Sequence, residues 1–244
     1  MRFVKNSPKG TELKVQEMVR PSDGKTIVLM GAMHAASRES WEDLTEVLRA
    51  YQSEDYEVHF EGVHPGHPVT DYEKTRVDIM QNLMNVGRKA AESTGLVYQK
   101  DALAHFSGAL NYDLDIVTIA RGLSDKAVKL LGGIPLDEIK ITPSRMLWSL
   151  KHMSWIINIS KFLPSTRSIL GKAIVDDRNK YAISRALESE HDVVLFWGAL
   201  HLDGMRKLLR QNGFVDGTAS WRIVIPRDYE ISDSRSEQHI AVSV

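Results

Sequence analysis

The sequence predicts an α/β fold in which helices flank a mainly parallel sheet core and a helical insert interrupts the middle of the chain. Two uncharged, β-rich runs, at residues 26–30 and 193–197, are each followed by a helical pattern. A further strand pattern at 56–61 follows the first helix, so that strand, helix and strand form one βαβ unit. Alternation of strands and helices is typical of a parallel sheet with helices on its faces.

The first elements are a short β element with turns up to residue 24 and a strand at 25–30. Ser37 is a suitable N-cap for the next helix, because its hydroxyl can accept a hydrogen bond from a free backbone N–H of the first turn. That helix is predicted to run to about Tyr51. Residues 56–61 alternate as a strand does, and a turn rich in Pro, Gly and His follows them.

A long helix is predicted over residues 70–92. Residues 70–73 have the spacing of a capping box, and Gly95 is a typical signal for the end of a helix. Beyond it, residues 101–171 are mostly helical by pattern and form the predicted insert. The β-rich run 116–119 inside the insert is too short to be assigned by periodicity.

The last part of the chain returns to the alternation of helices and strands. It contains a charge-rich helix at 172–189, the strand at 193–197, a helix at 203–211 and a final strand at 221–225. We therefore expect a single α/β domain over residues 1–227, with the helical insert at about 101–171 and a polar, mobile tail at 228–244.

The composition limits the kinds of site that the chain can carry. Its 31 basic and 32 acidic residues give a formal charge of −1, which provides no electrostatic footprint for nucleic acid or for an anionic membrane. The sequence has no cysteine, so disulfides, thiol catalysis and zinc–cysteine sites are excluded. Any metal must be bound by His, Asp, Glu or water.

The distribution of apolar residues favours a cytoplasmic protein. Residues 1–5 lead into polar sequence without the apolar core of a signal peptide. The most apolar long stretch, 146–163, is interrupted by lysine, histidine and asparagine, whereas a membrane span needs about 20 apolar residues. We therefore expect no transmembrane segment. The oligomeric state stays open.

A glycine-histidine motif occurs twice, at residues 31–34 (GAMH) and 198–201 (GALH), each time between a predicted strand and a predicted helix. The carboxyl ends of parallel strands lie at the sheet edge where open α/β proteins bind ligands. His34 and His201 are therefore expected to converge although they are far apart in the sequence. Glycine lets the backbone approach a ligand closely, and histidine supplies a metal ligand or a base near neutral pH.

Glu61 joins the two histidines because it ends the strand that follows the first motif. Two imidazoles and one carboxylate are a suitable donor set for a divalent ion with open positions, and water on such an ion can become a nucleophile near neutral pH. The alternative is that each residue is a strand-end polar group satisfied by backbone partners. The repetition of the motif in matching surroundings favours the functional interpretation.

Other polar residues near these strand ends have competing interpretations. His59 shares a strand face with Glu61, so it can support that carboxylate or act as an alternative ligand. His64 and His67 are expected to be solvated loop residues. Three further side chains can reach the same cleft: Gln99, Asp113 and Asp115. Helix capping explains the two aspartates equally well.

The motif residues resemble the pattern of the TraB/TIKI/PrgY superfamily, which is related more distantly to erythromycin esterase-like and ChaN-like proteins. That pattern has two Gly-x-x-His motifs, a glutamate after the first, and an acidic-Arg pair on a helix before the second. Here Glu61 resembles the glutamate, Asp177-Arg178 resembles the pair, and Gly204 follows the second motif. The resemblance covers roughly residues 25–215 and departs from TraB proteins in the histidine-rich turn after Glu61.

The resemblance implies a compact α/β fold with the motif residues in one cleft, and a metal-dependent hydrolase activity on a peptide or ester bond. His34, Glu61 and His201 would then be ligands of a divalent metal ion or acid-base groups. Arg178 would bind a substrate carboxylate or stabilise an oxyanion, because arginine is a fixed donor fork that cannot act as a base. For Asp177 and Arg178 the alternative is a charged helix face.

Two other functions are also consistent with the same residues. The first is a metal-free hydrolase in which one histidine is the general base and Glu61 orients it. The second is a non-catalytic regulatory protein that binds a peptide or a small molecule in the cleft. Activity that survives chelation would favour the first, and tight binding without turnover would favour the second.

Overall fold

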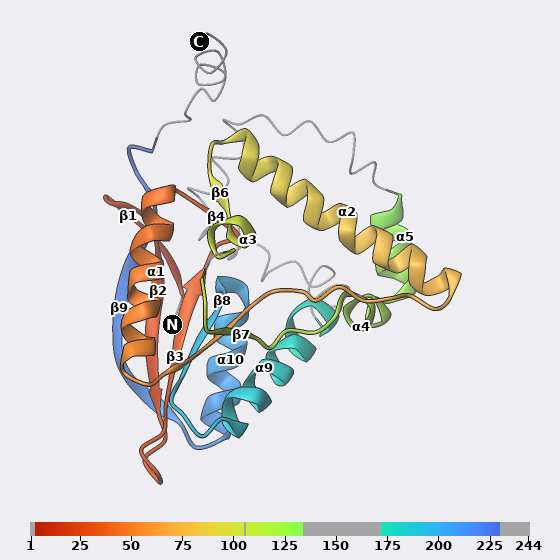
Figure 1. Cartoon of the computed structure of the whole chain (residues 1–244). Coiled ribbons are helices and arrows are strands. Elements are labelled where there is room, and N and C mark those ends of the chain that lie inside the picture. Colours follow the sequence, from red (N-terminus) through yellow and green to blue (C-terminus); the bar gives the residue numbers. More distant parts are fainter. Residues whose placement is uncertain (1–2, 105, 134–171, 230–244) are drawn as a thin grey trace.

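The computed structural model describes residues 3–104, 106–133 and 172–229 (Figure 1). Within these residues the central sheet has seven strands, in the order β1-β2-β3-β8-β5-β7 with β9 paired to β2. Its strands are β1 (Val4–Ser7), β2 (Gly10–Val19), β3 (Thr26–Ala32), β5 (Glu57–Phe60), β7 (Ala109–Asn111), β8 (Val193–Gly198) and β9 (Val215–Pro226). A separate two-stranded sheet pairs β4 (Ala35–Ala36) with β6 (Val97–Tyr98).

The central sheet is parallel in the region that carries the motifs and antiparallel on the other side. Strands β3, β8, β5 and β7 pair in parallel with their neighbours. Strand β2 is antiparallel to three strands, since β1 and β3 pair with successive parts of its length and β9 pairs along all of it. The predicted fold class is confirmed: the protein is α/β, with a mostly parallel central sheet and flanking helices.

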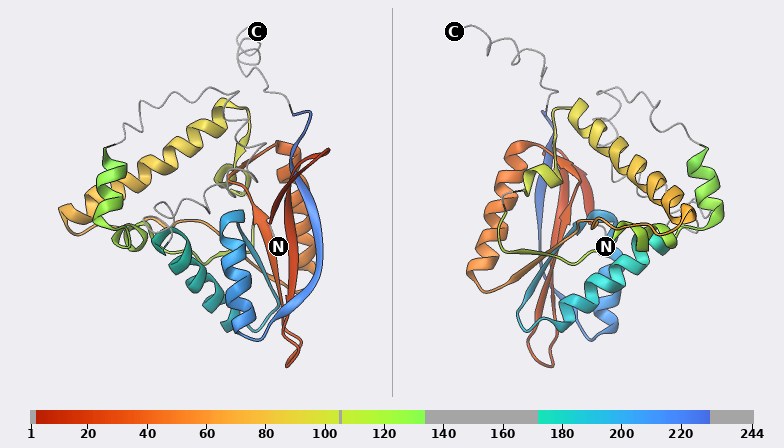
Figure 2. Two further views of the ribbon diagram at one scale, coloured as in Figure 1. Left: turned by 180° about the vertical axis from the view of Figure 1, so that it is seen from behind. Right: turned by 45° about the vertical axis from the view of Figure 1, so that its right-hand side comes forward.

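Helices lie on both faces of this sheet (Figure 2). The described helices are α1 (Arg38–Ser53), α2 (Asp71–Ser93), α3 (Gln99–Ala102), α4 (Ile116–Arg121), α5 (Asp125–Gly132), the π-helix η1 (Lys172–Asp176), α9 (Asp177–Glu188) and α10 (Ala199–Gln211). On one face Leu48 of α1 packs in the same core cluster as Phe196 of β8. On the other face Ile183 of α9 and Met205 of α10 share a core cluster with Trp197. Neighbouring residues of β8 thus face opposite cores, as side chains of a strand do.

A second helical group lies beside the sheet and consists of α2, α4 and α5 (Figure 1). Val77 and Met80 of α2 pack in one buried cluster with Ile116 and Ile119 of α4 and with Ala127 of α5. These side chains are at most 7 % exposed, so each loses most of its contact with water on folding. The loop that follows β5 therefore leads into α2, a helix that is packed against α4 and α5.

Three predicted boundary signals, at Ser37, residues 70–73 and Gly95, are found in the structure. Ser37 accepts a hydrogen bond from the backbone N–H of Ser40 and caps α1. Thr70 and Glu73 form the capping box at the start of α2. Gly95 follows the end of α2 with φ of 73°, a left-handed conformation that glycine adopts without strain. Local hydrogen bonding by short polar side chains therefore determined these boundaries.

The insert predicted as mostly helical contains a strand, at residues 109–111. These residues form β7, which pairs in parallel with β5 and so belongs to the central sheet. Three residues are too few for a period of two to be recognised in the sequence. The ambiguous run 116–119 is helical in α4, because Asp115 accepts hydrogen bonds from two backbone N–H groups at its start. Residues 134–171 of the predicted insert lie outside the described residues.

The predicted start of the last helix also needs correction. α10 begins at Ala199 instead of residue 203, so that His201 lies in its first turn rather than in the turn before it. The final strand is longer than predicted, since β9 extends through residues 215–226 against β2. The predicted tail is outside the described residues from residue 230 onward.

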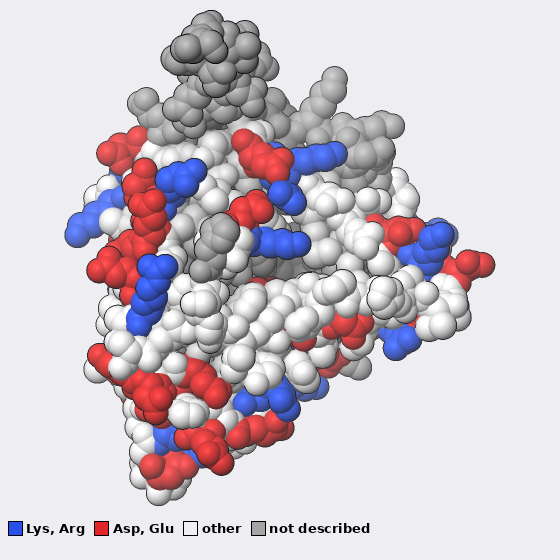
Figure 3. All heavy atoms as spheres, in the orientation of Figure 1, with Lys and Arg blue, Asp and Glu red and all other residues white. Residues whose placement is uncertain are grey.

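The surface of the described chain carries charges of both signs. Figure 3 shows Lys and Arg side chains interspersed with Asp and Glu side chains on one face of the molecule. Exposed ion pairs within helices include Arg88 with Glu92 and Arg185 with Glu188. None of the helices in the described ranges has the length and apolarity that crossing a membrane requires.

Candidate functional site

The two Gly-x-x-His motifs lie side by side because β3 and β8 are neighbouring parallel strands. In their register Gly31 pairs with Trp197, and Ala32 pairs with Gly198. Both motifs therefore leave the sheet at the same edge, as the parallel arrangement predicts. Strand β5 lies on the other side of β8 and brings Glu61 to this edge, where the Glu61 N–H donates to the carbonyl of Phe196 over 3.1 Å.

Glu61 is a buried carboxylate at the centre of the site. Its Oε1 accepts a hydrogen bond of 2.7 Å from Nη2 of Arg178, and its Oε2 accepts one of 2.6 Å from the backbone N–H of Gly198. Gly198 precedes α10, so this carboxylate also lies at the positive end of a helix. Burial alone raises the pKa of Glu61, but the hydrogen-bonding and positively charged groups around it, Arg178 among them, hold that pKa well below its usual range. Glu61 is therefore ionised at neutral pH.

Gly198 allows this contact because it has no side chain. A Cβ atom at this position would lie 2.8 Å from Oε2 of Glu61 and 3.7 Å from Cδ2 of His201. The backbone N–H could then not approach the carboxylate as it does. The glycine of the first motif is also confined, since a Cβ on Gly31 would lie 3.1 Å from Cβ of Leu13. At both motif glycines the backbone thus lies so close to a neighbouring side chain that a Cβ atom would crowd it.

Arg178 projects from α9 into the site and is held by two carboxylates. Its Nε and Nη2 donate to the two oxygens of Asp113 over 2.8 and 2.5 Å, and Nη2 also donates to Glu61. Its Nη1 donates to the carbonyl of Ile174 over 3.2 Å and lies 3.4 Å from Nε2 of His201. Burial lowers the pKa of Arg178, but Asp113 and Glu61 outweigh burial and raise it. All five N–H directions of the guanidinium thus meet groups of the protein.

The two aspartates that the sequence left open have different roles. Asp113 is 3 % exposed and binds Arg178, so it belongs to the cleft. Asp115 caps α4 through hydrogen bonds from Val117 and Thr118. Asp177 lies on the surface of α9, where its carboxylate is 3.7 Å from the ammonium of Lys180. The acidic residue next to Arg178 in the sequence is therefore part of a charged helix face.

His201 lies in the first turn of α10 and is 4 % exposed. Its Nδ1 is 2.7 Å from Oδ1 of Asn179, and the carbonyl of His201 accepts a hydrogen bond of 3.2 Å from Nδ2 of Asn179. Its Nε2 is 3.5 Å from Oε1 of Glu61. The ring also packs edge-to-face on Trp197, with 5.4 Å between centroids. Asn179 was not identified from the sequence, because only the packing of α9 on α10 brings it to His201.

His34 follows β3 and is the exposed member of the site, with 57 % of its side chain accessible. Its Nε2 lies 4.0 Å from Oε1 of Glu61. Its Nδ1 is 3.1 Å from Oε1 of Gln99, whose Nε2 donates to the carbonyl of Glu61 over 3.1 Å. The pairing of β4 with β6 brings Gln99 to this position, and the ring of Tyr98 lies 6.3 Å from that of His34. Solvent reaches the site from this side.

The other histidines of the region contact different groups. His59 is fully buried, with Nε2 2.9 Å from a Glu57 oxygen and its ring against Tyr112, so its described contacts do not support its interpretation as a partner of Glu61. His64 is half-buried and its Nε2 is 3.1 Å from the carbonyl of Asn111, so the expectation of a solvated loop residue is wrong for this histidine. His67 is exposed as expected.

The donor atoms of His34, Glu61 and His201 suit a divalent ion in their chemistry. Two ligands bound at 2.0–2.2 Å with tetrahedral angles lie about 3.4 Å apart. Nε2 of His201 and Oε1 of Glu61 are 3.5 Å apart, which is close to this spacing. Nε2 of His34 and Oε1 of Glu61 are 4.0 Å apart, which is longer. In the described ranges no group of three His, Cys, Asp or Glu side chains is spaced to hold a metal ion. The set therefore fits an ion in donor type, with His34 beyond ligand spacing.

The chain matches no known protein-family profile and no curated protein.

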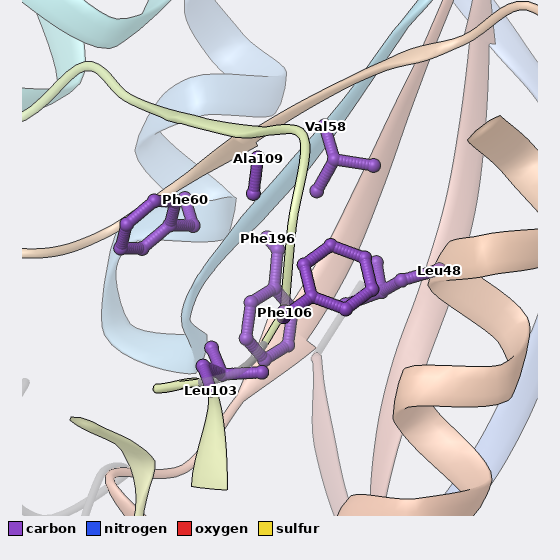
Figure 4. A pocket seen from close by; sticks show the side chains of 7 residues that line it. All are labelled: Leu48, Val58, Phe60, Leu103, Phe106, Ala109 and Phe196. Carbon is purple, nitrogen blue, oxygen red and sulfur yellow. The ribbon is translucent and has the colours of Figure 1, made fainter. Parts of the chain in front are cut away.

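A small apolar pocket lies against β5 and β8 (Figure 4). The core clusters place it on the opposite face of these strands from the polar site. Seven apolar side chains line it: Leu48, Val58, Phe60, Leu103, Phe106, Ala109 and Phe196. Phe196 and Val58 belong to the core under α1, whereas Trp197 and the site residues face α9 and α10. The pocket thus offers no polar group for chemistry and is separate from Glu61.

Proposed function

We propose that this chain is a hydrolase of TraB/TIKI type. It cleaves a peptide or ester bond of a substrate in the site around Glu61, with a divalent ion held by His34, Glu61 and His201. The observation that carries this proposal is the convergence of two imidazole Nε2 atoms on one oxygen of a buried, ionised carboxylate, at 3.5 and 4.0 Å. Two imidazoles and a carboxylate are a common donor set of catalytic zinc sites. When bound, such an ion acts as a Lewis acid and lowers the pKa of its water.

The protein residues around this donor set have distinct roles in the proposal. His201 and Glu61 are buried and fixed, so they form the rigid part of the set. His34 is exposed, so a substrate approaches from its side. Arg178 keeps Glu61 ionised and in place. Its Nη1 contact to His201, at 3.4 Å, is the longest of its five contacts and is the one that can be exchanged for a developing oxyanion.

A metal-free hydrolase is the second candidate, and the position of Arg178 favours it. A cation already lies against Oε1 of Glu61 and close to Nε2 of His201, which lowers the need for a metal to balance the carboxylate charge. In this metal-free mechanism Nε2 of His34 takes a proton from the attacking water and returns it to the leaving group. Glu61, 4.0 Å away, stabilises the imidazolium formed in between.

A hydrolysis assay with and without chelation separates these functions. The full chain is incubated with fluorogenic peptides and p-nitrophenyl esters, before and after treatment with EDTA and after addition of Zn²⁺, Mn²⁺ or Co²⁺. We expect turnover that EDTA removes, that metal restores and that Glu61→Gln abolishes. The matched control is His67→Ala, which changes an exposed histidine outside the site and should retain turnover.

The other outcomes decide against the proposal in different ways. Turnover that survives exhaustive chelation but is lost in His34→Ala supports the metal-free hydrolase. Tight binding of a peptide or small molecule without cleavage of any bond tested supports the non-catalytic regulatory protein. The proposal includes the cytoplasmic location expected from the sequence, which cell fractionation would test.

A further inference from the structure

We infer that Asn179 and Gln99 are positioning residues that fix both motif histidines in the same tautomer, with the proton on Nδ1 and the lone pair on Nε2. The two histidines follow different strands, β3 and β8, yet each has a side-chain amide oxygen at Nδ1, at 2.7 Å for His201 and 3.1 Å for His34. The consequence for catalysis rests on the proposed function, whereas the assignment of the tautomers does not.

The orientation of the Asn179 amide follows from its other contact. Its second polar atom is 3.2 Å from the carbonyl oxygen of His201, which can only accept a hydrogen bond. The NH₂ group must therefore face this carbonyl, and the amide oxygen must face Nδ1. An amide oxygen only accepts, so Nδ1 of His201 has to donate. In a neutral imidazole the lone pair is then on Nε2.

Arg178 gives independent support for the same tautomer of His201. Its Nη1 is 3.4 Å from Nε2, and a guanidinium can only donate. A proton on Nε2 would point toward this cation. The alternative acceptor for such a proton is Oε1 of Glu61, but it is 3.5 Å away, beyond the usual 2.7–3.2 Å of an N–H···O hydrogen bond, and it already accepts from Arg178.

Gln99 fixes His34 by the same reasoning. Its NH₂ group donates to the carbonyl of Glu61 over 3.1 Å, so its amide oxygen faces Nδ1 of His34. The backbone N–H of Gln99 also donates to the carbonyl of His34 over 2.8 Å. Gln99 is 5 % exposed and thus has little freedom to turn its amide over. Although the imidazole of His34 is exposed, its Nδ1 is held by the amide oxygen of Gln99.

Gly204 makes the contact of Asn179 possible. It lies on α10 one turn after His201, and a Cβ atom at this position would lie 2.4 Å from Nδ2 of Asn179. No side chain can be placed there unless the amide moves away from His201. The amide, the glycine and the histidine therefore form one packed unit between α9 and α10.

Two other histidines of the same chain have the opposite tautomer and serve as internal references. Nε2 of His59 is 2.9 Å from a carboxylate oxygen of Glu57, and Nε2 of His64 is 3.1 Å from the carbonyl of Asn111. Both partners only accept at neutral pH, so both histidines donate from Nε2. The motif histidines thus differ from these two in the position of the proton.

Under the proposed function, this tautomer is what the site requires. Metal ions and attacking water both need a lone pair on the ring nitrogen that faces Glu61, and an amide oxygen on the other nitrogen keeps it there. Removal of such an outer partner costs roughly 10–100-fold in metal affinity or activity. We expect losses of this size for Asn179→Leu and Gln99→Leu, which keep the approximate volume of the side chain.

The tautomers are read directly by long-range ¹H–¹⁵N correlation spectra of ¹⁵N-histidine-labelled full chain, without metal or substrate, at a pH where the imidazoles are neutral. We expect the proton on Nδ1 in His34 and His201, and on Nε2 in His59 and His64. Asn179→Leu should change the spectrum of His201 and leave that of His34 unchanged, and Gln99→Leu should do the reverse. Each variant is thus the matched control of the other.

Rescue variants and failures complete the test. Asn179→Asp and Gln99→Glu lose the NH₂ donor to the backbone carbonyl but keep an acceptor oxygen for Nδ1, so the proton on Nδ1 should be retained. If Asn179→Leu does not fold, Gly204→Ala displaces the same amide and should alter His201 alone. A proton on Nε2 of His34 or His201 in the wild-type chain, or a tautomer unaffected by loss of its amide, overturns the inference. An inactive chain with the expected spectra would overturn the proposed function and leave the tautomers in place.

Discussion

Replacement of Arg178 by methionine should strongly destabilise the protein at neutral pH. The guanidinium is 6 % exposed and forms ion pairs with Glu61, which is 4 % exposed, and with Asp113, which is fully buried. Without it both carboxylates stay buried and lose their shared cation, although the backbone N–H groups of Gly198 and Leu114 still donate to them. Loss of one partner of a buried ion pair costs about 3–5 kcal/mol, because the remaining charge is uncompensated. We expect a decrease of this size in the free energy of unfolding at pH 7.

The loss should become smaller as the pH falls. In the wild-type protein the pKa of Glu61 is held well below its unfolded value, so its ionised form stabilises the fold above about pH 4.3, and this contribution is lost as the pH falls through the folded-state pKa. In the variant, burial without the cation raises the pKa of Glu61, so the carboxyl becomes protonated and neutral in mild acid. The difference in stability between wild type and variant should therefore narrow between pH 7 and pH 4.

Urea denaturation followed by tryptophan fluorescence at several pH values measures both effects. Arg88→Met is the matched control, because Arg88 is half exposed and pairs with Glu92 one helical turn away, and we expect a change within about 0.5 kcal/mol. A loss below about 1 kcal/mol for Arg178→Met at pH 7 would refute the uncompensated-charge argument, as would a loss that grows toward low pH.

Three further predictions concern packing and charge. Gly198→Ala places a Cβ atom 2.8 Å from Oε2 of Glu61 and should lower the free energy of unfolding by about 1–3 kcal/mol in urea titrations; an unchanged midpoint would contradict the close-approach argument. Leu195→Ala removes a fully buried side chain between the sheet and α9, so a loss of about 2–5 kcal/mol is expected, and a loss of less than 1 kcal/mol would show a looser core. The pKa of Asp216 is lowered to about 2, chiefly by its hydrogen bond with Arg206, so it stabilises the fold above about pH 4 and loses this contribution as the pH falls to 2. Asp216→Asn should therefore lower the thermal unfolding midpoint at pH 7, and its difference from wild type should be much smaller at pH 2; an equal difference at both pH values would exclude this ion pair as the cause.

The parallel core could be predicted from the sequence because its strands are uncharged and lead into helices. Strands β3 and β8 are 7 and 6 residues long, enough for a β-rich run to be recognised. Strand β7 was missed because it has 3 residues and gains its stability from pairing with β5. Pairing between segments far apart in the sequence leaves no local pattern, so such a strand is visible only in the fold.

The positions of His34, Glu61 and His201 could be predicted for a related reason. Residues that end neighbouring parallel strands must lie at one edge of the sheet, whatever the intervening sequence is. The contacts of Asp113 and Asn179 could not be predicted in this way. They depend on a loop after β7 and on how α9 is rotated against α10, which local sequence does not determine.

The most direct test of the account is the metal content of the native protein, measured by elemental mass spectrometry after purification and after metal supplementation. We expect near-stoichiometric divalent metal in the wild-type chain and in His67→Ala, and its loss in His34→Ala and His201→Ala variants that circular dichroism shows to be folded. A folded wild-type chain that contains no metal even after supplementation would contradict the proposed metal site and favour the metal-free hydrolase or the binding protein.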